Sequence, residues 1–355
     1  MRVWEKYIRD VVPYVPGEQP QGDGLIKLNT NENPYPPAPG VQRALTGLAA
    51  DYDRLRKYPD PASAALVKVL ADYHGLNENR IFVGVGSDDV IAMAFLTFFN
   101  ADQPILFPDV SYSFYQVWAD LYRIPYRMPE LDEQYLIKKE DYYRENGGVI
   151  FPNPNAPTGI FMPLAEVKDI LDHNQDVIVI VDEAYIDFGG ESAEVLLADY
   201  DNLLVVRTFS KSRSMAGIRI GYAMGHERLI QALNDVKYSY NSYTMNLPSL
   251  VLGSEAVKDD AYFRQRIGQI ISTREWSMRR FGELGFHCLD SMANFLFVTH
   301  PQRSAQELSQ QLKKENIYVR YFNKPRLDRY LRISIGTDEE MEQLFQVLEM
   351  LINAE

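Results

Sequence analysis

The run Val177-Ile178-Val179-Ile180-Val181-Asp182 decides the fold class, because five apolar β-branched residues end on a single carboxylate. An uninterrupted apolar run of this length is typical of a strand whose two faces are both covered by helices, as in a parallel sheet. Similar short runs lie on both sides of it and alternate with helical stretches; they cover residues 81–85, 104–107, 149–151 and 203–206. The alternation predicts an open α/β fold with a mostly parallel sheet and right-handed crossovers.

Polar residues follow four of these five runs. Gly86-Ser87-Asp88 follows the first, Asn155 follows the third, Asp182 ends the fourth, and Lys211 lies just beyond the fifth. Ligands of open α/β sheets bind outside the carboxyl ends of the strands. The sequence therefore predicts one site that contains all of these residues.

Lys211 and Asp182 indicate the chemistry of this site. A lysine in a desolvated site loses its proton more easily, and its free amine can form a Schiff base with an aldehyde. Once freed again, the amine is placed to move a proton between the substrate Cα and the cofactor C4′. A carboxylate at Asp182 can keep a pyridine nitrogen protonated, so that the ring accepts the electron pair of a broken Cα–H bond. These groups predict pyridoxal 5′-phosphate as the cofactor. The alternatives are a solvated surface charge for Lys211 and a helix cap or arginine partner for Asp182.

Phosphate donors are also predicted at this site. Gly86-Ser87-Asp88 opens an apolar helix at residues 90–99, and the amides at a helix N-terminus attract anions. Thr208 and Ser210 add hydroxyl groups, and Arg219 adds a guanidinium suited to bidentate phosphate binding. Arg219 directly precedes an expected strand at residues 220–224, where a charge without a function would be unusual.

Three further residues can contact the cofactor ring. Tyr185 and the Asn155 amide lie on loops from which they could reach the ring oxygen O3′. Tyr112 could lie flat against the pyridine ring, although an aromatic core position is an equal alternative for it.

Bulk properties exclude several other functions. The net charge of −13 over 355 residues argues against a nucleic-acid surface. Cys288 is the only cysteine, and the five histidines show no metal-ligand spacing, so no disulfide or metal site is predicted. No apolar run approaches the roughly 20 residues that span a bilayer, and the N-terminus has no secretory h-region. A soluble cytoplasmic protein is expected.

Three regions are expected along the chain. Residues 1–28 are predicted to form an arm that packs on the small domain and the active site. Residues 29–250 form a large cofactor-binding domain, and residues 251–355 form a smaller α/β domain. The smaller domain begins with a long helix at residues 261–281 and continues with two strand–helix units, at residues 295–298 with 306–314 and residues 331–335 with 339–352.

The whole chain resembles the pyridoxal-phosphate-dependent aminotransferases of fold type I and, within them, the histidinol-phosphate aminotransferases. The matching segments are residues 27–34, 58–60, 86–89, 153–159, 182–185, 210–211, 219–222, 319–320 and 331–336. One departure is Asp89, where such proteins often carry glutamate, which leaves the role of that carboxylate open.

The resemblance implies a role for each site residue. Lys211 would be the Schiff-base lysine, Asp182 the partner of the ring nitrogen, and Asn155 and Tyr185 the partners of O3′. The phosphate would be held by Ser87, Asp88, Thr208, Ser210 and Arg219, beside Gly86, with Tyr112 stacked on the ring. In a homodimer with shared active sites, Tyr58 would reach the neighbouring subunit's cofactor phosphate. Tyr14, Asn33, Arg320 and Arg332 would bind the substrate.

The resemblance also implies a reaction: L-histidinol phosphate and 2-oxoglutarate would give imidazole acetol phosphate and L-glutamate, in histidine biosynthesis. Two alternatives keep the same residues, namely an aromatic or broad-specificity aminotransferase and a decarboxylase of a phosphorylated amino acid. An effector-sensing module of a transcription regulator is disfavoured, because only about 28 residues precede the first matching segment and the net charge is unsuited to DNA.

Overall fold

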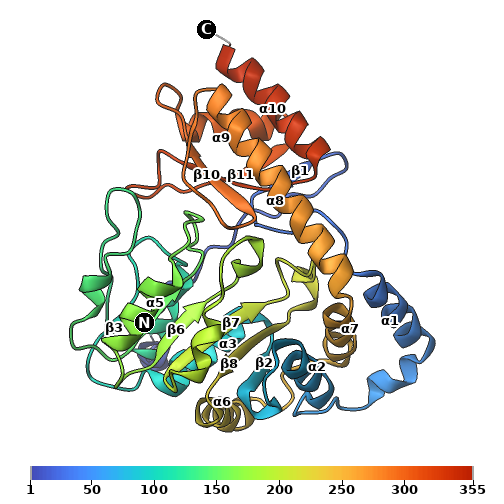
Figure 1. Ribbon diagram of the computed structural model, residues 1–355, viewed down its shortest axis with the longest axis vertical. Helices are drawn as coiled ribbons and strands as arrows, with labels where there is room; N and C mark the ends of the chain where they lie inside the picture. The colour runs from blue at the N-terminus through green and yellow to red at the C-terminus, as the bar shows by residue number, and fades with distance from the viewer. Residues whose placement is uncertain (1, 354–355) are drawn as a thin grey trace.

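The computed structural model describes residues 2–353, and its larger part is built around a seven-stranded sheet (Figure 1). The strand order is β2-β8-β7-β6-β5-β3-β4. All neighbouring pairs from β7 to β4 are parallel, which confirms the predicted mostly parallel sheet. The strands are β2 (Ile81–Gly84), β3 (Ile105–Leu106), β4 (Tyr126–Arg127), β5 (Val149–Pro152), β6 (Val179–Asp182), β7 (Leu203–Thr208) and β8 (Gly221–Gly225).

The edge strand β2 departs from the expected parallel pairing. It pairs only with β8, which runs antiparallel both to β2 and to β7. The run at residues 81–85 is nevertheless buried throughout β2, because helices cover both faces of the sheet at this edge too. Burial of β2 on both faces therefore explains why its residues are all apolar. An all-apolar strand can pair in either direction, so the sequence pattern does not predict whether β2 is parallel or antiparallel to its neighbour.

Both faces of the larger sheet pack against helices, as the apolar run at residues 177–182 predicts. In β6, Val179 and Val181 face one apolar cluster and Ile180 faces the other. The first face is covered by α1 (Pro39–Ala50), α2 (Ala64–His74), α5 (Leu164–Asp172) and α7 (Leu247–Lys258). The second is covered by α3 (Gly86–Phe98), α4 (Phe114–Tyr122) and α6 (Glu227–Tyr240).

A smaller five-stranded sheet lies above the larger part in Figure 1, next to α9 and α10. Its order is β1-β11-β12-β10-β9, with β1 (Ile26–Leu28), β9 (His287–Cys288), β10 (Phe295–Thr299), β11 (Ile317–Tyr321) and β12 (Leu331–Ser334). Its helices are α8 (Asp260–Glu283), α9 (Ala305–Lys314) and α10 (Asp338–Asn353), close to the predicted ranges. The strands β1, β9 and β11 were not predicted, and β1 joins this sheet by parallel pairing with β11.

Short 3₁₀ helices connect these elements, at Val3–Tyr7, Tyr52–Arg56, Glu78–Arg80, Lys139–Tyr142, Ile186–Phe188, Ala193–Ala198 and Ala216–Ile218. Within residues 2–353, no helix has the length and apolar character needed to cross a membrane.

Candidate active site

The ends of β5, β6 and β7 bring most of the predicted residues together. Asp182 is the last residue of β6 and lies opposite Pro152 of β5, and the Asn153 backbone N–H donates to the Asp182 carbonyl at 2.8 Å. Thr208 ends β7, and Lys211 lies in the loop that follows. Arg332 of the smaller sheet contributes to the electrostatic environment of both Lys211 and Tyr185. The site therefore lies between the two sheets.

Asp182 is a buried carboxylate without a cationic partner among residues 2–353. It accepts hydrogen bonds from the Tyr115 hydroxyl at 2.8 Å and from the Ala184 backbone N–H at 3.2 Å. Burial raises the pKa of Asp182 to about 6, against these two hydrogen bonds. The carboxylate is thus held in place but not neutralised, which suits a ligand that carries a positive charge.

Replacing Asp182 with asparagine is expected to stabilise the cofactor-free protein at high pH. The pKa of Asp182 in the folded protein lies above the ordinary value of 3.8 for an aspartate, so folding buries no charge at this position below about pH 4. The free energy of unfolding then falls as the pH rises from there through about 6. At pH 8 the variant should therefore unfold with a free energy about 1–3 kcal/mol larger than wild type. Chemical denaturation at pH 4 and pH 8 measures this; an equal difference at both pH values would contradict it.

Lys211 has the properties of an amine that reacts while neutral. Its Nζ donates to the Thr30 carbonyl at 3.1 Å and forms no ion pair within the described chain. Removal from water, followed by the charge of Arg332, lowers the pKa of Lys211 to about 8, although Glu32 opposes this. Asn33, predicted to bind substrate, holds the lysine loop: its Nδ2 lies 3.0 Å from the Lys211 carbonyl and 3.2 Å from that of Ser212.

A cradle of donors forms around the start of α3. The Arg219 guanidinium lies over Gly86, 3.3 Å from Ser210 Oγ and 3.4 Å from Asp88 Oδ2. Gly86 has a φ of +83°, and a Cβ there would meet Arg219 Nη2 at 2.6 Å, so glycine is required. Thr208 Oγ1 hydrogen-bonds to Ser210 Oγ at 3.0 Å. The hydroxyls, the guanidinium and the amides at the helix start are groups that could together hold an anion.

The two carboxylates at the start of α3 have different roles. Asp88 accepts from the Tyr112 hydroxyl at 2.8 Å and faces Arg219. Its carboxylate would repel a phosphate, so only its backbone N–H suits the predicted role. Asp89, whose role was open, accepts from the Val85 backbone N–H at 2.9 Å and fixes the turn into the helix.

Tyr185 and Asn155 are both buried. The Tyr185 hydroxyl accepts from Asn31 Nδ2 at 2.9 Å, and its ring packs edge-on against Phe295. Asn155 Nδ2 donates to the Val110 carbonyl at 3.0 Å and to Thr158 Oγ1 at 3.1 Å, but its Oδ1 has no partner within residues 2–353. A buried polar atom without a partner is costly, which indicates that a ligand completes this position.

Arg320 and Arg332 lie directly opposite each other on β11 and β12. Neither forms an ion pair with any residue of the described chain. Arg332 Nη2 donates to the Asn29 carbonyl at 3.1 Å, whereas its buried Nε has no partner among residues 2–353. Burial, together with the smaller effect of the positive charge of Arg320, lowers the pKa of Arg332. Two neighbouring guanidiniums without a carboxylate form a second anion site.

Tyr14 lies near this second anion site, whereas Tyr58 does not join either site. The Tyr14 ring stacks on Phe114 with 4.1 Å between centroids, lies 6.3 Å from the Tyr112 ring, and is influenced by the charges of Arg320 and Arg332. Tyr58 is 82% exposed, and its ring packs on Tyr243 at 4.6 Å. Within a single chain, Tyr58 is therefore a surface residue.

Two residues of this site were not found from the sequence. Tyr115 donates to Asp182. The feature of the sequence that could have identified it is its position three residues after Tyr112, in the same aromatic segment. Asn31 donates to Tyr185. Its distinguishing feature is a positive φ of 56°, which the sequence does not reveal.

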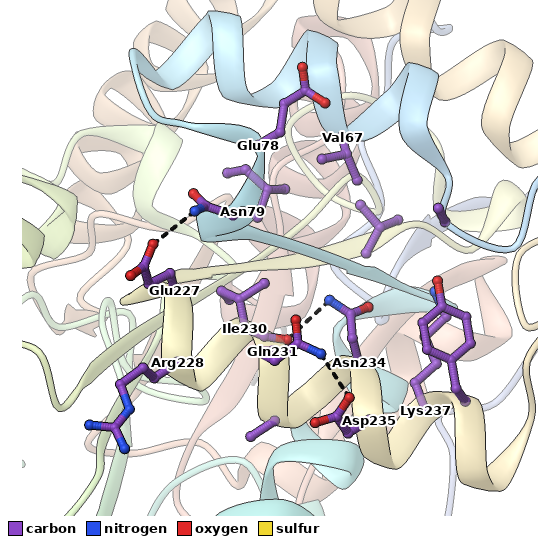
Figure 2. Close-up of a pocket in the computed structure, with 15 residues that line it drawn as sticks. Val67, Glu78, Asn79, Glu227, Arg228, Ile230, Gln231, Asn234, Asp235 and Lys237 are labelled. Carbon is purple, nitrogen blue, oxygen red and sulfur yellow. Dashed lines mark hydrogen bonds between the residues drawn. The ribbon is translucent and has the colours of Figure 1, made fainter.

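One groove of the described chain lies elsewhere and does not have the character of this site. It measures about 670 Å³ and lies beside α6, as Figure 2 shows. Its polar side chains bind one another: Asn79 donates to Glu227 at 2.9 Å, and Gln231 donates to Asp235 at 2.8 Å. None of the predicted site residues lines it.

The chain is similar to known proteins over nearly its whole length. Residues 23–348 match the family described as aminotransferase class I and II. The chain is 48% identical over 352 residues to a histidinol-phosphate aminotransferase of Clostridium botulinum, covering 99% of both chains.

Two solved structures share the fold, each at 24% identity. One is the histidinol-phosphate aminotransferase of Clostridium acetobutylicum, with a TM-score of 0.85 over 93% of this chain and 100% of that one. The other is that of Sinorhizobium meliloti in complex with pyridoxal-5′-phosphate, with a TM-score of 0.83 over 93% and 91%. The chain belongs to the class I and II aminotransferases, a family dependent on pyridoxal phosphate, and within it to the histidinol-phosphate aminotransferases.

Proposed function

We propose that this enzyme transfers the amino group of L-histidinol phosphate to 2-oxoglutarate. The observation that carries the proposal is the pair Arg320 and Arg332, two adjacent guanidiniums with no acidic partner among residues 2–353. Such a pair suits an anion at the far end of a substrate. The family relationship supplies the substrate, because the 48% identical relative is named for histidinol phosphate.

The residues around Asp182 and Lys211 fit pyridoxal 5′-phosphate. Asp182 is buried and lacks a cation, the amine of Lys211 is partly deprotonated at neutral pH, and Asn155 Oδ1 lacks a partner in the described chain. Gly86, Ser87, Thr208, Ser210 and Arg219 would hold the phosphate. When bound, the cofactor supplies a ring that accepts the electron pair released from the substrate Cα.

The protein's own groups would direct protons and charge around that ring. With a pKa of about 8, Lys211 Nζ can both accept a proton and return it, so it would move the proton of the substrate Cα. Tyr115 donates to Asp182 and so would hold the carboxylate in position for the ring nitrogen. Tyr112 is held by Asp88 at the position from which it would cover one ring face.

One arginine pair can serve both half-reactions. L-Histidinol phosphate has a phosphate and no carboxylate, whereas 2-oxoglutarate has a second carboxylate. A guanidinium binds either anion in bidentate fashion. The aromatic pair Tyr14 and Phe114 lies near this end and suits a planar imidazole. The same stack would also accept an aromatic amino acid, which makes aromatic transamination the second candidate.

A homodimer with shared sites is part of this proposal. Tyr58 is exposed although aromatic and its ring packs on the exposed Tyr243, and further exposed apolar residues precede it in the sequence, namely Leu45 on α1 and Tyr52 and Leu55 on the 3₁₀ helix that follows. A set of this kind on a monomer surface indicates a protein interface. A second copy placed on it would bring its own Tyr58 toward the phosphate cradle.

Mixing two impaired variants tests the shared site. Lys211→Ala and Tyr58→Ala should each have low activity alone, but a hybrid dimer would contain one site with both changes and one intact site. After subunit exchange, the mixture should recover about a quarter of wild-type activity if dimers form at random. Activity that stays at the sum of the separate variants would contradict a shared site. Leu45→Ala mixed with Lys211→Ala is the control, because Leu45 offers no polar group to a phosphate.

A spectral half-reaction screen tests the substrate. The cofactor-loaded enzyme is mixed separately with L-histidinol phosphate, phenylalanine, tyrosine and phosphothreonine, and the loss of the absorbance of the lysine-bound cofactor is followed. L-Histidinol phosphate should react fastest, and 2-oxoglutarate should restore the original spectrum. Faster reaction of an aromatic amino acid would favour the second candidate. Release of carbon dioxide without a need for 2-oxoglutarate would instead show a decarboxylase.

A further inference from the structure

Asn31 connects Tyr185 to the strand that carries Arg332. It is buried, and its backbone N–H donates to Ser334 Oγ at 2.8 Å, while Ser334 Oγ lies 3.2 Å from Asn31 Oδ1. Asn294 Nδ2 donates to the Asn31 carbonyl at 3.0 Å. Ser334 ends β12, two residues after Arg332, and Asn294 directly precedes β10. Asn31 is therefore anchored to the smaller sheet, next to the strand that carries Arg332.

The order of donors and acceptors fixes how the Asn31 amide is turned. A backbone N–H can only donate, so Ser334 Oγ accepts from it and directs its own proton to Asn31 Oδ1. The amide nitrogen then faces the Tyr185 oxygen, 2.9 Å away. With the amide reversed, the Ser334 proton would have no acceptor among residues 2–353.

This arrangement decides where the Tyr185 proton points. A phenol has one proton to donate, and its oxygen can also accept. Because Asn31 donates to that oxygen, Tyr185 cannot direct its proton at the amide nitrogen, and the proton is left for an acceptor inside the site. A hydrogen bond received by a hydroxyl also strengthens the one that it donates.

We propose that Asn31 is a positioning residue that directs the Tyr185 proton toward the O3′ side of the cofactor site and couples it to the strand of Arg332. This inference rests on the proposed function, because it takes Tyr185 to face the cofactor. The φ of 56° explains why asparagine serves here, since asparagine adopts this left-handed conformation more readily than most residues.

The test is a double-mutant cycle between Asn31 and Tyr185. Asn31→Asp keeps the shape, the acceptor for Ser334 and the tolerance of positive φ, but it replaces the donor with an acceptor that attracts the Tyr185 proton. The affinity of the cofactor-free protein for pyridoxal 5′-phosphate is measured by equilibrium dialysis. The absorbance of the bound cofactor is titrated with pH as a second readout.

Asn31→Asp is expected to weaken cofactor affinity about three- to tenfold, the effect of one lost hydrogen bond. It should also move the absorbance midpoint to higher pH, because the ring oxygen loses a donor that stabilises its charged form. In the Tyr185→Phe background the same change should alter affinity less than about twofold. Ser334→Ala, which removes only the anchor, should shift both readouts in the same direction but less.

Asn146→Asp is the matched control, since Asn146 is another buried asparagine whose Nδ2 donates to Asn174 Oδ1, away from the site. It should move neither readout. An unchanged affinity for Asn31→Asp, or an equal loss with and without the Tyr185 hydroxyl, would overturn the role of Asn31 alone. A wild-type protein that does not bind the cofactor would instead overturn the proposed function.

Discussion

Replacing Lys211 with alanine is expected to lower kcat by about 10⁴-fold or more, because one amine both bonds to the cofactor and moves the substrate proton. The loss should exceed that of any other single change at the site. Its structural basis is an amine that is removed from water, has no carboxylate partner in the described chain, and has a pKa lowered to about 8. Steady-state kinetics at saturating cofactor measures the effect.

The absorbance spectrum provides an independent readout for the same variant. Lys211→Ala should still bind the cofactor through the phosphate cradle, but it should show the spectrum of the free aldehyde. Lys68→Ala is the matched control, because Lys68 lies on the exposed face of α2 and pairs only with Asp72. Retained turnover in Lys211→Ala, or an unchanged spectrum, would contradict the role of this lysine.

Replacing Arg332 with methionine is expected to lower kcat/KM by about 100- to 1,000-fold for both substrates, as when one partner of a buried charge pair is removed. The Arg332 guanidinium lies 5.4 Å from the centres of the Phe295 and Phe322 rings and donates to the Asn29 carbonyl, and these contacts hold it in position. Equal losses for L-histidinol phosphate and for 2-oxoglutarate would show that one site serves both anions. A loss confined to 2-oxoglutarate would place the phosphate elsewhere.

Stability should change in the opposite direction in this variant. Without an anion, Arg332 is a desolvated cation with no acidic partner within residues 2–353, and burial lowers its pKa. A methionine of similar length removes that cost, so the thermal midpoint of the cofactor-free protein should rise. Arg329→Met, at an exposed position shortly before β12, should change neither kinetics nor stability appreciably. A fall in the midpoint of Arg332→Met would show that the side chain is mainly structural.

The pattern of apolar runs predicted the architecture of the larger sheet well. Runs buried on both faces, such as residues 177–181, carry no polar positions, and this signal is local in the sequence. The direction of β8 was not predicted, because pairing depends on the partner strand rather than on the strand's own residues. The strand β1 was missed for the same reason: three residues, Ile26–Leu28, form a strand only because β11 lies beside them.

The candidate site was predictable where it depends on residue type and on position at a strand end. Lys211, Asp182 and Arg219 are examples, and the structure brings them to neighbouring loops. The partners that hold these residues were not predictable. Tyr115 and Asn31 act through single hydrogen bonds across 67 and 154 positions of chain, and such contacts exist only after folding. Glu183 and Arg207, whose buried ion pair packs behind the site, are missed for the same reason.

Reduction of the cofactor-loaded enzyme with borohydride, followed by peptide mass spectrometry, tests the central claim most directly. The reaction fixes the cofactor covalently to whichever lysine holds it. We expect the added mass on Lys211. Lys237 is the natural competitor, because it is also buried with a lowered pKa, although its amine donates to the Pro61 carbonyl, outside the site. Labelling of Lys237, or of any lysine other than Lys211, would contradict the account.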